Sequence, residues 1–232
     1  MTIATNLIHM ADLSLLKLLQ LSSPTLPVGA FAYSQGLESA IENEIVTDVE
    51  SLQNWLADCL RLSLKFVDLP IFSRLYQCWS VGDIEGAMHW NQMLVAQRET
   101  RELRDEDHHL GVALARLLTD LDIEQAKVLK SKDSMCFLTS FTLAACEWQV
   151  SEEQAANGFV WSWLDNQIAA AIKLVPLGQT DGQRVLSAIL PKIPLIVSVG
   201  LALPEEEIGA SLPMLAILSS QHETQYSRLF RS

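Results

Sequence analysis

Four side chains in the middle of the sequence could together bind a metal ion. Glu102, Asp105, Glu106 and His109 follow an i, i+3, i+4, i+7 spacing, which places them on one face of a helix. Carboxylate and imidazole groups are possible ligands for nickel or zinc. The neighbouring His108 adds nothing, because adjacent helical residues diverge by about 100° and cannot chelate one ion together. A solvated acidic face is the simpler interpretation, and we predict neither a metal site nor a cofactor.

A second stretch has glycines spaced somewhat like those of a phosphate-binding loop. A P-loop needs a lysine and a hydroxyl residue after its glycines to hold phosphates and magnesium. The sequence GQTDGQR, residues 178–184, has two glycines and no lysine, so we interpret it as a polar junction between helices. The chain also lacks the GxSxG elbow of a serine nucleophile. We therefore predict no catalytic residue and expect that the chain is not an enzyme.

Two arginines in the segment Glu99–Arg104 (ETRELR) form a third candidate group. Arg101 and Arg104 stand three residues apart among carboxylates. Guanidinium groups can form a buried ion network or bind the carboxylates of a partner in a bidentate manner. Pairing within the chain is the simpler of the two interpretations, and binding to a partner stays open.

The stretch from Leu26 to Glu38 has backbone features that call for an explanation. Pro27 fixes one backbone angle, and Gly29 permits a positive φ or a close approach. Gly36 falls inside an expected helix, where it costs roughly 1 kcal/mol against alanine, so we expect another backbone to pass close to it. An internal helix crossing is favoured over a partner surface. The candidate residues are Leu26, Pro27, Val28, Gly29, Phe31, Tyr33, Ser34, Gly36 and Glu38.

The C-terminal segment, residues 221–232, is the fifth candidate. If it is helical, Tyr226, Leu229 and Phe230 form an apolar edge, while Arg228 and Arg231 stand together elsewhere. Apolar anchors combined with arginines are typical of protein interfaces. Docking onto the chain's own core and binding to another protein are equally plausible. The partner-binding candidates are His222, Glu223, Tyr226, Ser227, Arg228, Leu229, Phe230, Arg231 and Ser232.

Composition narrows the class of protein. The 232 residues are 49% apolar and 19% charged, with a net charge of −12, which indicates one folded domain over residues 1–232 and no nucleic-acid partner. Four cysteines without a CxxC pattern predict neither a disulfide nor a zinc site. The apolar stretch Val185–Leu203 is interrupted by two prolines and a lysine. Its uninterrupted part, Pro194–Leu203, is too short to span a membrane. We expect a cytoplasmic protein without a membrane partner.

Helical periodicity dominates and predicts the elements that position these residues. Apolar residues recur at three- and four-residue spacing, so we expect an all-α bundle of about nine or ten helices. Thr47 and Glu50 predict a capping box before the helix of residues 49–67, and Pro213 is expected to kink or divide a last helix that starts near Pro204. The other predicted helices cover residues 71–79, 83–97, 100–118, 135–148, 151–175, 181–190 and 195–203.

Four stretches, in this order along the chain, resemble the UreF family of urease accessory proteins. They are Leu15–Glu38, Glu99–Arg104, Leu174–Arg184 and His222–Ser232, and together they extend over essentially the whole chain. No single hexapeptide among them is decisive, whereas the four together are specific. Ala32 departs from the pattern, since a hydroxyl residue is expected there more often.

The resemblance implies a non-catalytic, all-α chaperone that assists assembly of the nickel centre of urease. Such a protein forms a homodimer and binds a UreD (also called UreH) partner and the GTPase UreG, and the assembly docks on apo-urease. The C-terminal residues 222–232 are then part of the surface offered to UreD/UreH. Residues 26–38, 99–104 and 178–184 are expected to build the dimer and the partner-facing or internal passage surfaces; the candidates in the last range are Gly178, Gln179, Asp181, Gly182 and Arg184.

Two alternatives remain beside the scaffold. In one, the chain is a GTPase-activating protein whose Arg101, Arg104, Arg228 or Arg231 enters the partner's site, which can contribute about 10³–10⁵ in rate. In the other, the chain is an unrelated helical enzyme or binds nickel itself through the acidic face that contains Glu102.

Overall fold

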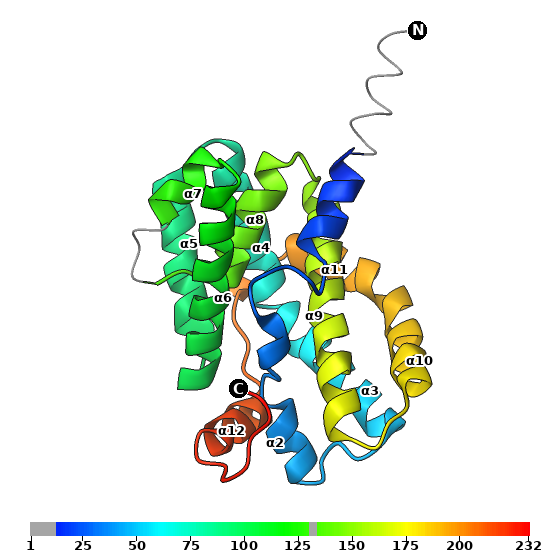
Figure 1. Ribbon diagram of the computed structural model, residues 1–232. Coiled ribbons are helices and arrows are strands. Elements are labelled where there is room, and N and C mark those ends of the chain that lie inside the picture. Colours follow the sequence, from blue (N-terminus) through cyan, green and yellow to red (C-terminus); the bar gives the residue numbers. More distant parts are fainter. Residues whose placement is uncertain (1–12, 130–133) are drawn as a thin grey trace, which may run out of the picture.

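The computed structural model describes residues 13–129 and 134–232, which form helices joined by loops (Figure 1). Within these residues, eleven α-helices carry labels, and a further helical segment covers residues 13–21. The predicted all-α class is therefore confirmed. The helices are α2 (Leu37–Glu42), α3 (Val49–Asp58), α4 (Asp68–Ser80), α5 (Ile84–Gln97), α6 (Arg101–Asp120), α7 (Glu124–Leu129), α8 (Phe137–Glu147), α9 (Glu152–Leu174), α10 (Gln179–Ile189), α11 (Ile193–Leu201) and α12 (Pro213–His222).

An aromatic cluster marks the centre of the core, where α4, α8 and α9 pack together. The rings of Phe141 and Phe159 lie 5.5 Å apart between centroids, and Phe72 lies 6.1 Å from Phe159 and 6.3 Å from Phe141. Their planes are tilted or perpendicular, which suits the quadrupoles of aromatic rings. Helices α5 and α6 pack on one side of this cluster, and α10 and α11 pack against α9 on the other (Figure 1).

Three helices start at side-chain caps near their predicted first residues, and one predicted cap is wrong. Asp83, Thr100 and Ser151 each accept a hydrogen bond from the backbone three residues ahead, as N-cap residues do. The predicted capping box at Thr47 and Glu50 is wrong, because Asp48 and Ser51 form it one residue later. Both pairs have suitable spacing, and only the geometry of the loop decides between them.

Prolines begin helices in this fold more often than they end them. The predicted helix of residues 71–79 starts earlier than expected, at Asp68, so Pro70 lies in the first turn of α4, where its missing N–H has no intrahelical partner to lose. Pro213 opens α12 as its first residue, a favoured position. The predicted last helix from Pro204 is consequently wrong: residues Glu205–Glu207 form a single 3₁₀ turn (η4) that a loop separates from α12.

The predicted helix of residues 49–67 changes character halfway along. After α3 ends at Asp58, residues Cys59–Leu64 form a π-helical segment, η2. Wider turns of this kind are rare and often lie at functional sites. Here the segment lines an internal cavity that is described below.

Gly36 does not lie inside a helix, which corrects one prediction and confirms another. It is the N-cap of α2 with a φ of +77°, a conformation that glycine adopts at little cost. A Cβ atom there would meet the Leu215 side chain of α12 at 3.0 Å and the backbone nitrogen of Ser219 at 3.6 Å. Another backbone therefore passes close by, as expected.

Candidate functional site

The ten residues after α12, which we call the tail (residues 223–232), fold back over the chain's own helices (Figure 1). The Arg231 N–H donates to the Ala32 carbonyl at 2.8 Å, and the Ser34 N–H donates to the Ser232 carbonyl at 2.9 Å. Phe230 and Ser232 are buried. The end of the tail is not helical, because the N–H groups of Leu229, Phe230 and Arg231 are bonded to Glu38 and Ala32 and not to the preceding turn. Of the two interpretations left open by the sequence, docking onto the own core is thus observed.

Glu38, in the first turn of α2, binds the tail through two further hydrogen bonds. Its Oε1 accepts a hydrogen bond from the Leu229 N–H at 2.6 Å, and its Oε2 accepts one from the Phe230 N–H at 2.8 Å. The residue is only 6% exposed. A buried carboxylate is stable where several N–H donors surround it, and the tail supplies those donors.

His222, the last residue of α12, lies between two carboxylates. Its Nδ1 is 2.7 Å from Oε2 of Glu102 on α6, and its Nε2 is 3.1 Å from Oε2 of Glu38. Arg228 of the tail donates to the other oxygen of Glu102 at 2.7 Å. The imidazole is completely buried. These four side chains, which we call the ion cluster, join α2, α6, α12 and the tail.

Glu106 anchors the end of the tail one helical turn further along α6. It accepts hydrogen bonds from Gln35 Nε2 and from Ser232 Oγ, both at 2.7 Å. Burial raises the pKa of Glu106 to about 7, and these two hydrogen bonds oppose that rise. This carboxyl therefore exchanges its proton near neutral pH while it holds the tail.

The acidic face of α6 is not the solvated surface that we expected from the sequence. Glu102 and Glu106 are buried beneath the tail, and Tyr33 Oη lies 3.4 Å from Nδ1 of His109. Asp105 remains exposed and pairs with Arg101. Among the residues that the structure describes, no three His, Cys, Asp or Glu side chains form a group that could hold a metal ion.

The tail also presents apolar and cationic side chains outward. Tyr226 is fully exposed and Leu229 is 63% exposed. Glu223, Ser227 and Arg231 are exposed as well. The predicted apolar edge is thus split, since Phe230 turns inward while Tyr226 and Leu229 face solvent.

The Glu99–Arg104 segment starts α6 and ties it to α12. The Thr100 hydroxyl lies 2.7 Å from that of Ser219, and Glu99 accepts a hydrogen bond from Ser211 Oγ at 2.7 Å. Arg101, with 78% of its side chain exposed, has only a 3.4 Å contact with Asp105. Arg101 and Arg104 therefore contact groups of their own chain, as the simpler interpretation predicted, but they do so at the surface and not in a buried network.

That buried network exists, but its arginine is Arg98, just before the motif. Arg98 contacts Asp68 of α4 at 2.6 Å and Asp107 of α6 at 2.7 Å, and its carbonyl accepts a hydrogen bond from Arg104. Burial by itself would lower the pKa of Arg98, whereas the two carboxylates raise it well above its usual value. Sequence spacing gave no signal for this group, because Asp68 is thirty residues away.

The loop before α2 places the remaining motif residues. Phe31, in the 3₁₀ turn η1 (Ala30–Ala32), is 68% exposed, whereas Tyr33 and Ser34 are buried. Gly29 precedes this turn with a φ of +84°. Leu26 and Val28 are half-buried and pack against the core, and Pro27 is exposed. The loop therefore has an inner side under the tail and an outer side with an exposed aromatic ring.

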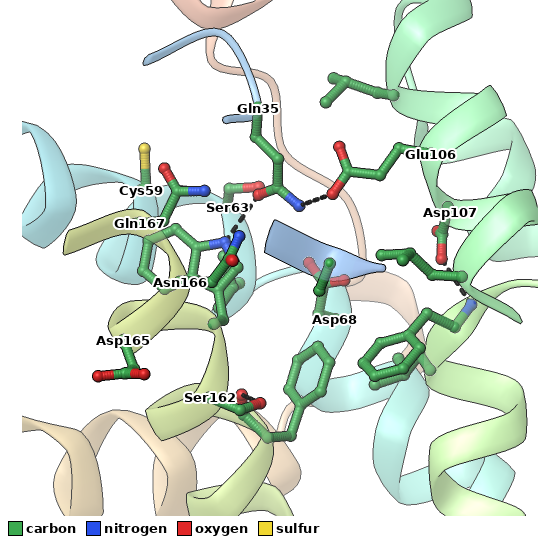
Figure 2. Close-up of a pocket in the computed structure, with 18 of the residues that line it drawn as sticks. Gln35, Cys59, Ser63, Asp68, Glu106, Asp107, Ser162, Asp165, Asn166 and Gln167 are labelled. Carbon is green, nitrogen blue, oxygen red and sulfur yellow. Dashed lines mark hydrogen bonds between the residues drawn. The ribbon is translucent and has the colours of Figure 1, made fainter. Parts of the chain in front are cut away.

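A cavity of about 230 Å³ lies beneath this loop, between α4, α6, α9 and η2 (Figure 2). Gln35, Asp68, Glu106 and Asp107 are among the residues that line it, and Figure 2 shows Gln35 pointing toward Glu106, with Asp107 on the same helix as Glu106. Gln167 of α9 is 1% exposed and its Nε2 has no hydrogen-bond partner. The predicted passage residues contribute Leu26, Val28, Phe31 and Glu99 to its lining.

Comparison with known proteins identifies the family. The UreF family model matches residues 46–190. The urease accessory protein UreF of Hahella chejuensis is 48% identical over 223 residues, which cover 96% of this chain and all of that protein. UreF of Marinomonas sp. is 45% identical over 231 residues, which cover 100% of this chain and 99% of that protein. This chain belongs to the UreF family.

The third UreF-like stretch, Leu174–Arg184, lies apart from the other three. Asp181 caps the start of α10 through the Gly178 N–H at 3.4 Å and pairs with Arg184 at 2.8 Å. A Cβ atom on Gly182 would lie 2.5 Å from Ile172 of α9, and Gln179 is the first residue of α10. None of these residues lines the cavity. The stretch serves helix packing in this UreF-family fold.

One segment of this UreF-family chain passes a length and hydropathy test for a membrane span. Residues 179–201 have a mean hydropathy of 1.6, and 33% of the tested window is buried. The segment is not one helix, because α10 ends at Ile189 and the 3₁₀ turn η3 (Leu190–Lys192) precedes α11. The four cysteines are free, and two of them are buried.

Proposed function

We propose that this chain is a non-catalytic scaffold that bridges UreD/UreH and the GTPase UreG during nickel insertion into apo-urease in the cytoplasm. One observation carries the proposal. Residues 26–38, 99–104 and 222–232 are far apart in sequence and are joined into one surface by the hydrogen bonds described above. Phe31, Tyr226 and Leu229 are exposed there, and large apolar side chains outside the core are typical of protein interfaces.

Exposed leucines support a homodimer as part of the same proposal. On the helical segment of residues 13–21, four leucines are each more than half exposed; they are Leu13, Leu15, Leu16 and Leu19. An apolar helix face open to water gains free energy when it is covered by another chain.

The test is co-purification with UreD/UreH, UreG and apo-urease, followed by an assay of urease activity. Deletion of the tail is a poor probe, because it also removes buried contacts of Phe230 and Ser232. The double substitution of Tyr226→Ala and Leu229→Ala removes only exposed groups, and Val81→Ala, at a residue that is 78% exposed on the α4–α5 turn, is the matched control. We expect the double variant to lose capture of UreD/UreH and activation of urease. Unchanged capture would contradict the proposed surface.

A second candidate is activation of GTP hydrolysis by UreG. The observation that favours it is the exposed guanidinium of Arg101 beside the tail residue Arg231 in one surface groove. Arg104 and Arg228 are less suitable because both are bonded within the chain. If an arginine enters the partner's site, Arg101→Ala or Arg231→Ala lowers GTP turnover in the assembled complex by about 10³-fold or more. Unchanged turnover in both variants would rule this candidate out.

A further inference from the structure

The ion cluster lacks one N–H donor if the imidazole of His222 is neutral. A neutral imidazole has one N–H donor and one bare nitrogen that accepts. Both ring nitrogens of His222 face carboxylate oxygens, at 2.7 and 3.1 Å. A bare nitrogen opposite an ionised carboxylate oxygen would place two lone pairs against each other, so the geometry requires one further proton between the ring and the carboxylates. Imidazole is more basic than a carboxylate, so we place this proton on His222 as an imidazolium that donates from both nitrogens.

The charges of the cluster lead to the same conclusion. With an imidazolium, the two carboxylates of Glu38 and Glu102 are balanced by His222 and Arg228. With a neutral imidazole, the cluster carries a net charge of −1. The side chains of His222, Glu38 and Glu102 are 0%, 7% and 10% exposed, so water does not screen an unbalanced charge, which is costly in such a site.

The tail depends directly on this arrangement. Glu38 holds the N–H groups of Leu229 and Phe230 with the same carboxylate that faces His222. Glu102 holds Arg228 with the same carboxylate that faces the other imidazole nitrogen. Repulsion at His222 therefore displaces both carboxylates that bind the tail.

We propose that docking of the tail onto α2 and α6 is coupled to the uptake of one proton by His222. The proton comes from solvent when the tail docks and returns to solvent when it leaves. The tail is consequently docked at lower pH and released as the pH rises, which frees the Glu38 and Glu102 carboxylates together with the backbone of the tail. Any effect of tail release on partner binding rests on the proposed function. The coupling between tail docking and proton uptake is a property of the isolated chain.

The other charged groups near His222 are as follows. Glu38 from α2, Glu102 from α6 and Arg228 from the tail are its direct neighbours. Glu106 accepts a hydrogen bond from Ser232 of the tail, and burial raises its pKa. Its protonation therefore also favours the docked tail at lower pH. The adjoining surface groove is lined by Arg101, Asp105, His109, Glu223 and Arg231, and Lys173 of α9 lies over the Phe230 ring.

Amide hydrogen exchange at Leu229 and Phe230 tests the proposal on the isolated full chain. Exchange is measured by NMR from about pH 5 to about pH 9, the range around which an imidazole exchanges its proton, and is corrected for the intrinsic rate at each pH. One coupled proton lowers the docking constant by up to about ten-fold per pH unit. We expect protection at both amides to fall steeply, while the amide of Val160 in α9 reports global unfolding.

Three variants separate the role of His222 from general effects. His222→Gln cannot take up a proton, so protection at Leu229 and Phe230 is expected to be lower at acidic pH and to lose the steep part of its pH dependence. Glu102→Gln gives Nδ1 a neutral partner and is expected to remove the same dependence while His222 is intact. His89→Gln changes an exposed histidine on α5 and should leave the profile unchanged.

Two results would overturn the proposal. One is equal protection of Leu229 and Phe230 across the whole series in the unaltered chain. The other is an unaltered pH profile in His222→Gln. If His222→Gln does not fold, Glu102→Gln and the unaltered chain still decide the question. Neither result would bear on capture of UreD/UreH, so the proposed function would stand or fall separately.

Discussion

Replacing Glu106 by glutamine should make the protein more stable at alkaline pH and leave it nearly unchanged in mild acid. The folded state raises the pKa of this carboxyl from 4.5 to about 7 because burial disfavours the charge. The folded protein therefore binds more protons than the unfolded chain between these two values. The stability that Glu106 contributes is fully present below about pH 4.5 and is lost as the pH rises through about 7.

The size of the effect follows from the shift. A difference of about 2.5 pKa units, from 4.5 to about 7, corresponds to about 3 kcal/mol at 1.36 kcal/mol per unit. Glutamine resembles the protonated acid: its carbonyl can accept from Gln35, and its amide can donate to Ser232. We expect the free energy of unfolding of Glu106→Gln to exceed that of the unaltered chain by about 3 kcal/mol near pH 8.

Urea denaturation followed by circular dichroism, at about pH 5 and about pH 8, measures this difference if both transitions are two-state with equal slopes. The matched control is Glu205→Gln, because Glu205 is exposed on η4 and is expected to change stability by less than about 0.5 kcal/mol at either pH. A Glu106→Gln variant that is less stable than the unaltered chain at pH 8, or that shows the same pH profile, would refute the argument from burial.

Three further substitutions test the packing around the site by urea denaturation. Arg98→Met leaves two buried carboxylates without their partner and should cost about 3–5 kcal/mol; a loss below about 1 kcal/mol would mean that water reaches them. Gly111→Ala places a Cβ 2.2 Å from the Met135 carbonyl oxygen and should destabilise strongly, whereas Gly178→Ala, with its nearest contact at 3.5 Å, should be within about 0.5 kcal/mol; similar effects at both would contradict the close approach. Phe141→Ala removes the ring in the centre of the aromatic cluster and should cost about 3–5 kcal/mol, and a smaller loss would indicate that the core collapses around the gap.

The helices were largely predictable, because their signals are local. Apolar spacing and cap residues such as Asp83, Thr100 and Ser151 lie within one or two turns of the helix they begin. The errors in helix boundaries arise where a local signal is ambiguous. At Pro70 and Pro213, the same residue type can end one helix or begin the next, and only packing around it decides which.

The functional site was predictable in part. The stretches 26–38, 99–104 and 222–232 could be singled out, but their mutual contacts could not. Arg98 and Gln35 were missed because nothing near them in sequence marks their partners. Glu102 and Glu106 were singled out as possible metal ligands with a solvated acidic face as the simpler alternative, whereas they are buried and hold the tail.

The sequence by itself determined the helical class, most helix starts and the membership of the UreF family, because hydrophobic periodicity, capping and family motifs all reside in short stretches of chain. Only the tertiary structure decided that the tail folds back over α2 and α6, that His222 lies between Glu38 and Glu102, and that Glu106 is buried. The physical reason is that charge pairing and desolvation depend on distances in space between residues more than a hundred positions apart, and spacing along the chain does not encode those distances.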